Sequence, residues 1–219
     1  MMILQIDGLL SKESILALCA TLAREHDTFV SGKTTAGWAA KAVKNNDQSI
    51  GPAAQAAISE VRDALLGNAV FKAAVRPKEI IGMLVSRYRP GMSYGSHVDD
   101  AMMQGKRTDL SFTLYISDAQ TYAGGELVIE GNDGDSAIKL AAGSVVVYPT
   151  TSLHHVAEVT QGERIVVVGW IRSYIRNAEQ REMLFDLDQT IAALQSADQA
   201  ILNRVLKTRN NLLRMWVED

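Results

Sequence analysis

Three side chains that together suit a metal ion stand at two distant places in the sequence. His97 and Asp99 form a His-x-Asp step, and His154 opens a His-His pair much further along the chain. In an extended segment residues i and i+2 project from the same face, so the imidazole and the carboxylate of this step converge on one point. With the second imidazole they form a two-histidine, one-carboxylate facial triad, which leaves part of the coordination sphere open, as in non-haem iron oxygenases.

A plainer interpretation of the same residues stays open. An imidazole beside a carboxylate is as often a surface hydrogen bond as a ligand set. His97 and Asp99 would then be a polar pair at a loop edge, and His154 and His155 would be ordinary rim residues. The metal interpretation therefore needs support from other parts of the chain.

Arg164 opens the most β-branched stretch of the chain and supplies that support. Counting by two, Arg164, Val166, Val168 and Trp170 share one face of a strand. If this face lines an apolar cavity, the guanidinium requires an anion, and a small molecule with a carboxylate would satisfy it through a bidentate fork. The alternative is an arginine whose head reaches solvent and pairs with Glu163.

The order and spacing of these residues form a recognisable pattern. It comprises Tyr88 nine residues before His97, Gly-Gly-Glu-Leu at 124–127, Pro149 through His154, Arg164 ten residues after His154, and Trp170. From about Ile80 to Tyr174 the chain resembles the iron(II)- and 2-oxoglutarate-dependent dioxygenases of the prolyl 4-hydroxylase superfamily. More narrowly it resembles the bacterial PKHD-type hydroxylases, which family context links to iron uptake and which also carry a helical tail.

The resemblance implies a role for each matching residue. His97, Asp99 and His154 resemble the catalytic iron ligands, Arg164 the basic residue that pairs with the distal carboxylate of 2-oxoglutarate, and Tyr88 its hydroxyl partner. Trp170 matches a cavity-wall tryptophan, and Ser111 stands near a threonine that contacts the same carboxylate in relatives.

The third ligand has a neighbour of the same type. A ligand at His155 would shorten the spacing to Arg164 to nine residues, and neighbouring strand residues face opposite ways. We therefore expect His154 to be the ligand, with the contribution of His155 left open.

The resemblance also implies a reaction. Oxidative decarboxylation of 2-oxoglutarate by dioxygen would be coupled to hydroxylation of a substrate, with L-ascorbate as a stimulator. The sequence leaves the substrate open among a peptidyl side chain, a free amino acid and an iron-chelating small molecule. Two other functions use the same scaffold: a nucleic-acid demethylase, and a non-catalytic sensor that binds iron and 2-oxoglutarate.

The elements that must position these residues fall into three regions. Apolar spacing predicts helices over Ser11–Glu25 and about Pro52–Leu66, joined by a polar connector. Short β-branched or aromatic segments between turn residues predict strands at 80–85, 110–116, 126–130, 137–140, 144–148 and 164–171. The helical period returns from Asn177 to Asp219.

The expected fold is therefore α+β, with a double-stranded β-helix (jelly-roll) core and flanking helices. We expect residues 1–76 to form a helical region packed on the barrel, 77–175 the dioxygenase domain, and 176–219 a helical extension.

Composition limits the partners and the compartment. The chain has 219 residues with 47% hydrophobic residues and a net charge of −3, so nothing in its overall charge favours nucleic acid. The single cysteine, Cys19, cannot form an internal disulfide, which favours the cytoplasm. The N-terminus lacks a basic region before an apolar stretch, and the longest apolar run, Ile165–Ile171, is too short for a membrane helix. No membrane partner is expected, and a homo-oligomer is compatible with the sequence.

Overall fold

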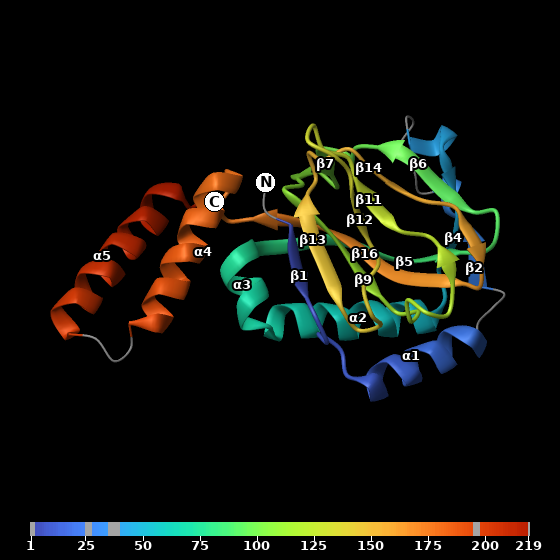
Figure 1. The fold of residues 1–219 in the computed structure, drawn as a ribbon, viewed down its shortest axis with the longest axis horizontal. Helices are drawn as coiled ribbons and strands as arrows, with labels where there is room; N and C mark the ends of the chain where they lie inside the picture. The colour runs from blue at the N-terminus through green and yellow to red at the C-terminus, as the bar shows by residue number, and fades with distance from the viewer. Residues whose placement is uncertain (1–2, 25–27, 35–39, 195–197, 219) are drawn as a thin grey trace.

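The core of the protein is a sandwich of two antiparallel sheets, seen in a computed structural model that describes residues 3–24, 28–34, 40–194 and 198–218 (Figure 1). In this part of the chain the architecture is the predicted jelly roll with helices on either side in sequence. Glu25 and Asp219, the ends of two predicted helical regions, lie outside the described residues.

The larger sheet has seven strands. Their spatial order is β1 (Leu4–Ile6), β13 (Val145–Pro149), β9 (Leu110–Tyr115), β16 (Arg164–Ser173), β5 (Pro77–Tyr88), β4 (Asp47–Ser49) and β2 (Phe29–Ser31). The smaller sheet has five, in the order β12 (Ser136–Ile138), β11 (Leu127–Ile129), β14 (His154–Val156), β6 (Ser93–His97) and β3 (Lys44–Asn45). Two separate two-stranded sheets pair β7 (Met102–Met103) with β8 (Lys106–Arg107), and β10 (Ala123–Gly124) with β15 (Val159–Gln161).

Three helices cover the outer face of the larger sheet: α1 (Lys12–Arg24), α2 (Pro52–Gly67) and α3 (Ala69–Val75) (Figure 1). Ser11 caps α1 by accepting a hydrogen bond from the Ser14 N–H at 3.1 Å, and Pro52 occupies the first turn of α2, where its missing N–H costs little. Asn68 ends α2 and caps α3 through its side chain.

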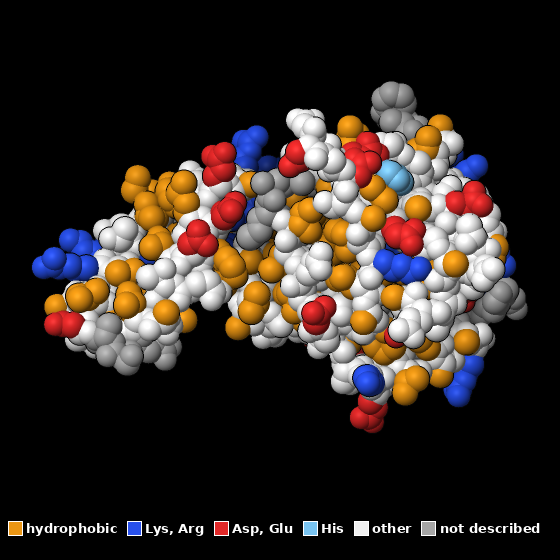
Figure 2. All heavy atoms as spheres, in the orientation of Figure 1, with side chains coloured by type: hydrophobic (Ala, Val, Ile, Leu, Met, Phe, Trp, Pro, Cys, Tyr) orange, Lys and Arg blue, Asp and Glu red, His pale blue; other side chains and the backbone are white. Residues whose placement is uncertain are grey.

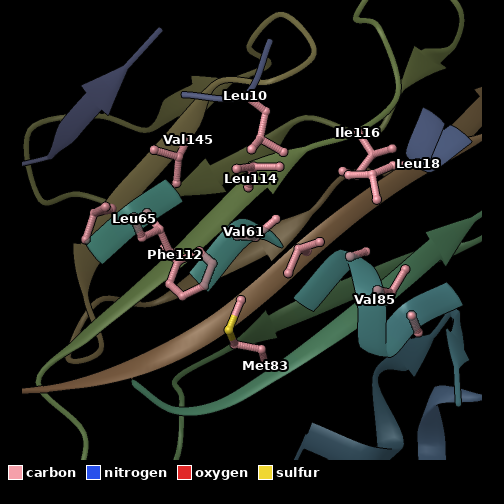
Figure 3. Close-up of a cluster of buried hydrophobic side chains, with 14 of the residues drawn as sticks. Leu10, Leu18, Val61, Leu65, Met83, Val85, Phe112, Leu114, Ile116 and Val145 are labelled. Carbon is pink, nitrogen blue, oxygen red and sulfur yellow. The ribbon is translucent and has the colours of Figure 1, made fainter. Parts of the chain in front are cut away.

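The main hydrophobic core lies between these helices and the larger sheet (Figure 3). Leu18, Val61 and Leu65 from the helices meet Phe112 and Leu114 on β9. The intervening residues of β9 project from the other face, toward the smaller sheet. Both faces of β9 are thus buried, which is why its sequence is nearly continuous in apolar and small residues.

A second cluster lies between the two sheets. Tyr115, Val146, Tyr148 and Val166 of the larger sheet pack there against Leu127 and other residues of the smaller sheet. This inner layer is where the candidate site residues of the sequence analysis meet.

The segment expected to be a polar connector is different in the structure. It contains β2, β3 and β4, with short 3₁₀ turns at Gly32–Thr34 and Ala40–Ala42. β4 extends the larger sheet beside β5, and β3 extends the smaller sheet beside β6. The hydrophobic pattern missed β3 and β4 because their buried side chains are polar, and β2 is only 3 residues long.

The last two helices, α4 (Ala178–Ala193) and α5 (Gln199–Trp216), form a hairpin that projects from the sandwich (Figure 1). Arg76 joins the hairpin to the body by pairing with Asp188 at 2.5 Å, and Arg107 pairs with Glu218 at 2.6 Å. None of the residues of α5 is fully buried, and hydrophobic side chains show on the surface of the hairpin (Figure 2). Within the described residues, every helix is too short or too polar to cross a bilayer.

Candidate metal centre and adjoining cavity

His97 and His154 face each other across two neighbouring strands. They are register partners in the pairing of β6 with β14, and their ring centroids lie 4.3 Å apart. Each Nδ1 lies against a backbone carbonyl: His97 against Gly95 O at 2.9 Å and His154 against Ser152 O at 3.0 Å. A carbonyl only accepts, so each Nδ1 donates its proton, and in the neutral ring the lone pair then lies on Nε2, where it can bind a ligand.

Asp99 completes the group just beyond the end of β6. Its Oδ1 lies 3.9 Å from His97 Nε2, and its Oδ2 lies 3.9 Å from His154 Nε2. The three ligand atoms all lie within 4.8 Å of one another, and the described residues contain no second such group of three. Ser111 Oγ donates to Asp99 Oδ2 at 2.5 Å and so orients the carboxylate.

Two tyrosines support the histidine rings. Tyr94 stacks on His97 with ring centroids 3.7 Å apart. Tyr148 and His154 meet edge to face, with ring centroids 5.1 Å apart. Burial, assisted by the neighbouring His154, lowers the pKa of His97 to about 4. His97 is therefore a neutral imidazole at pH 7, the form that binds a metal ion.

His155 lies on the opposite side of β14. Its Nδ1 is 2.9 Å from Glu130 Oε1, and the ring is half-buried. The structure thus brings His154, and not His155, together with His97 and Asp99.

Arg164 is buried at the start of β16, with 1% of its surface exposed. It is the register partner of Tyr88 on β5, and its guanidinium carbon lies 5.1 Å from the Tyr88 ring centroid. Its Nε is buried with no hydrogen-bond partner among the described residues. Glu163 lies 3.7 Å from Arg87 instead, so the alternative of a solvent-exposed Arg164 paired with Glu163 is wrong.

The Gly-Gly step of the sequence pattern makes room beside Arg164. Gly125 has a φ of +69°, and a Cβ there would lie 3.0 Å from Arg164 Cδ and 3.1 Å from Tyr122 Cε2. Gly124 has a φ of +71°, and a Cβ there would lie 2.0 Å from the Glu158 carbonyl oxygen. Both positions favour glycine for its backbone freedom and for the space that it leaves.

One cavity of about 340 Å³ connects these residues. The three candidate ligands, Arg164, Tyr88 and Trp170 all line it. Trp170 is therefore part of the wall, as expected. Ser111 also lines it, but its hydroxyl bonds Asp99, whereas the expectation placed it against the distal carboxylate of 2-oxoglutarate.

Several cavity residues were missed by the sequence analysis. Lys44, Asn46 and Gln48 line the cavity from the segment interpreted as a connector. The available signal was the placement of these three polar residues at every second position, but such spacing of polar residues does not distinguish a strand from a loop. Tyr115 and Tyr122, which do not line the cavity, were also missed, and the charge of Arg164 acts on both hydroxyls in the direction that lowers their pKa values.

The chemistry of these side chains fits a divalent iron ion and a dicarboxylate. Two imidazoles and one carboxylate are a suitable donor set for Fe(II) with open positions. A buried guanidinium with an unpartnered Nε, beside the buried hydroxyl of Tyr88, is suited to a carboxylate.

Two family descriptions match the chain. Residues 83–172 match the 2OG-Fe(II) oxygenase superfamily, and residues 179–218 match the PKHD-type hydroxylase C-terminal domain. Among solved structures, a Pseudomonas putida prolyl-4-hydroxylase has a similar fold, with a TM-score of 0.56, 22% identity, and coverage of 78% of this chain and 92% of that one. A Trichoplax adhaerens prolyl hydroxylase has a TM-score of 0.60 at 13% identity, covering 83% and 86% of the two chains.

Relatives match over most or all of the length. A PKHD-type hydroxylase of Maricaulis maris is 56% identical over 194 residues, which is 87% of this chain and 89% of the relative. One from Parvibaculum lavamentivorans is 48% identical over 221 residues and covers 100% of both chains. The chain therefore belongs to the PKHD-type hydroxylases, within the 2OG-Fe(II) oxygenase superfamily, and is a 2-oxoglutarate-dependent dioxygenase that uses Fe(II).

Proposed function

We propose that His97, Asp99 and His154 hold Fe(II), and that Arg164 and Tyr88 bind the distal carboxylate of 2-oxoglutarate. The observation that carries this proposal is the convergence of three ligand atoms within 4.8 Å, in the same cavity as a buried arginine with an unpartnered Nε. The iron, when bound, supplies the activation of dioxygen. The reaction converts 2-oxoglutarate to succinate and carbon dioxide and hydroxylates an unidentified substrate.

The chain's own residues orient and shield these groups. The Gly95 and Ser152 carbonyls fix the imidazole tautomers, and Ser111 fixes the Asp99 carboxylate. Tyr94 and Tyr148 pack against the rings, and the His97 and His154 side chains are only 7% and 5% exposed. Such pre-organisation and exclusion of water are what a protein contributes to chemistry done by a bound cofactor.

Further parts of the proposal rest on the resemblance and the composition. We infer an iron-uptake link, stimulation by ascorbate, a cytoplasmic location and no nucleic-acid partner. The division into regions 1–76, 77–175 and 176–219 also remains a prediction, and the sequence is compatible with a homo-oligomer.

Removal of a ligand tests the metal site. His97→Ala, Asp99→Ala and His154→Ala should each weaken Mn(II) binding, measured anaerobically by calorimetry, by more than about 100-fold, because loss of a supporting residue alone costs about 10–100-fold. His155→Ala is the matched control and should bind Mn(II) nearly as wild type does. Wild-type affinity in Asp99→Ala would refute the assignment, and the opposite ranking of the two histidine variants would move the third ligand to His155.

Succinate release separates the enzyme from the two rival functions. The wild-type protein with Fe(II), dioxygen and 2-oxoglutarate should form succinate, and cell extract should gain a product heavier by one oxygen atom. A protein that binds 2-oxoglutarate but forms no succinate under any of these conditions would be a sensor. Oxidation confined to methylated nucleic acid would identify a demethylase.

A further inference from the structure

The helical hairpin of α4 and α5 has an apolar side that the described residues leave uncovered. Along α5, apolar residues and one threonine recur at intervals of four and three, which is the spacing of a coiled-coil seam. Met215 and Ile201 in this seam are 73% and 53% exposed, and none of the residues of α5 is fully buried. The α5 seam consists of Ile201, Val205, Thr208, Leu212 and Met215.

A second seam with the same spacing runs along α4. Met183 in this seam is 53% exposed, although Leu184 beside it is completely buried against the rest of the protein. The seam is therefore distinct from the side of α4 that packs on the body. The α4 seam consists of Met183, Leu187, Thr190 and the C-cap residue Leu194.

The two seams lie on the same side of the hairpin. Arg209 Nε donates to Asp188 Oδ1 at 2.9 Å, so these two residues mark the sides on which the helices face each other. The preceding residue of each helix, Thr208 or Leu187, belongs to a seam and is rotated by about 100° around its helix. Because the two helices run in opposite directions (Figure 1), equal rotations along each chain turn both seams to one side. The two seams together are here called the hairpin face.

Charges of opposite sign accompany the two seams. The exposed charged residues of α4 are all acidic: Glu179, Glu182 and Asp186. The exposed charged residues of α5 are all basic: Arg204, Lys207 and Arg214. The hairpin face therefore has an acidic half and a basic half.

A face with two halves of opposite charge is complementary to itself. A two-fold axis parallel to the helices places α4 of one copy on α5 of the other, so that acidic side chains meet basic ones. The four helices then form an antiparallel bundle with coiled-coil packing. A membrane surface suits the face less, because anionic lipids would attract α5 but repel the acidic side chains of α4.

The hairpin face is also large enough for a specific contact. Helices of 16 and 18 residues are about 24 and 27 Å long, and each is about 10 Å wide. Two copies together would cover about 1,000 Å², which is the lower limit for a specific interface.

We propose that the protein is a homodimer in which the hairpin faces of two copies pack against each other, α4 on α5. The residues that line the cavity beside the candidate metal centre all lie between Ala40 and Trp170. The dimer contact is therefore separate from that cavity, and the proposal does not depend on the function proposed above.

Sedimentation velocity of the full chain tests this proposal. Wild type should sediment as a dimer that dissociates on dilution. Met215→Asp places a carboxylate in the hairpin face, where burial of an unpaired charge should raise the dimer dissociation constant about 100-fold or more. Leu16→Asp is the matched control, because Leu16 is 70% exposed on α1, outside the hairpin face. It should dimerise as wild type does, and equal circular dichroism of the three proteins shows that a monomer is still folded.

Exchange of charges tests the pairing of α4 with α5. Arg204→Glu with Lys207→Glu should weaken the dimer about tenfold or more at low salt, because like charges then meet. Glu179→Lys with Asp186→Lys should have a similar effect. A chain with all four substitutions has complementary halves again, so its dissociation constant should return to within about threefold of that of wild type.

Three outcomes would overturn the proposal. One is a wild type that stays monomeric at every soluble concentration, and another is equal dimerisation of wild type and Met215→Asp. The third is a fourfold variant that dimerises no better than either double variant, since α4 would then not lie on α5. If the wild type is monomeric and binds vesicles of anionic lipid, and Arg204→Glu with Lys207→Glu abolishes that binding, the face is a membrane-binding surface instead.

Discussion

Arg164 shows how one residue links burial to ligand choice. A guanidinium with 1% exposure has lost its water, and an aromatic cage of Tyr88 and Tyr115, at 5.1 and 5.5 Å, replaces only part of that hydration. Its Nε hydrogen remains without a partner among the described residues. A carboxylate that enters the cavity would supply both a countercharge and two acceptors in the plane of the guanidinium.

Substitution of Arg164 should therefore weaken the binding of 2-oxoglutarate and leave the binding of the metal unchanged. Lysine keeps the charge but loses the planar fork, so Arg164→Lys should weaken 2-oxoglutarate binding by about 1–3 kcal/mol. Arg164→Met should weaken it more. Titration of 2-oxoglutarate into Mn(II)-loaded protein without dioxygen measures this, and Mn(II) affinity is the internal control. An unchanged 2-oxoglutarate constant in Arg164→Met would place the anchor elsewhere.

At the scale of elements, β16 is central to the larger sheet because it pairs with β5 on one side and β9 on the other. Gly169 lies in the middle of this strand, where Phe112 crosses it. A Cβ on Gly169 would lie 2.5 Å from Phe112 Cε1 and 2.8 Å from the Gly82 carbonyl oxygen. Phe112 belongs to the core under the helices, so this contact couples strand spacing to helix packing.

Gly169→Ala should accordingly destabilise the fold. The added methyl group must displace Phe112 or the β5 backbone, and overpacking of this kind costs about 1–3 kcal/mol in the free energy of unfolding. Gly67→Ala is a suitable control because a Cβ there meets nothing within 4 Å. Urea denaturation measures both, and equal stability of the two variants would show that the strands can separate without cost.

At the scale of the whole molecule, buried tyrosines set the response to alkaline pH. Burial raises the pKa of Tyr88 and Tyr115 above the usual value, and it raises that of Tyr122 to about 12, although the charge of Arg164 opposes the shift. In the unfolded chain these groups ionise near pH 10. Between those values the folded protein binds more protons than the unfolded chain, so stability falls as pH rises.

We therefore expect the contribution of Tyr122 to the free energy of unfolding to be constant below about pH 10. It should be lost progressively between about pH 10 and pH 12. Tyr122→Phe removes this titration, and it also removes a buried hydroxyl that has no partner among the described residues. The variant should lose less stability than wild type over this interval in urea denaturation at a series of pH values. Parallel curves for the two proteins would contradict the assignment.

Much of the fold follows from local patterns in the sequence. The apolar spacing of Ile15, Leu18 and Leu22 predicts α1, and the structure buries these three side chains. The β-branched run from Arg164 predicts β16 almost to its end. Periodicity failed for β3 and β4, since strands whose inward residues line a polar cavity carry no hydrophobic alternation.

The identity and spacing of the candidate metal ligands and of Arg164 could also be predicted from the sequence. A His-x-Asp step, a distant histidine and an arginine ten residues later form a linear pattern. Only the tertiary structure decided which side chains meet. The pairing of β6 with β14 sets His97 opposite His154 and turns His155 outward to Glu130. The sandwich buries Arg164, while Glu163 lies against Arg87, and it brings Lys44 into the cavity that the candidate metal ligands line. These outcomes depend on strand register and long-range packing, which bring together residues that no local pattern relates.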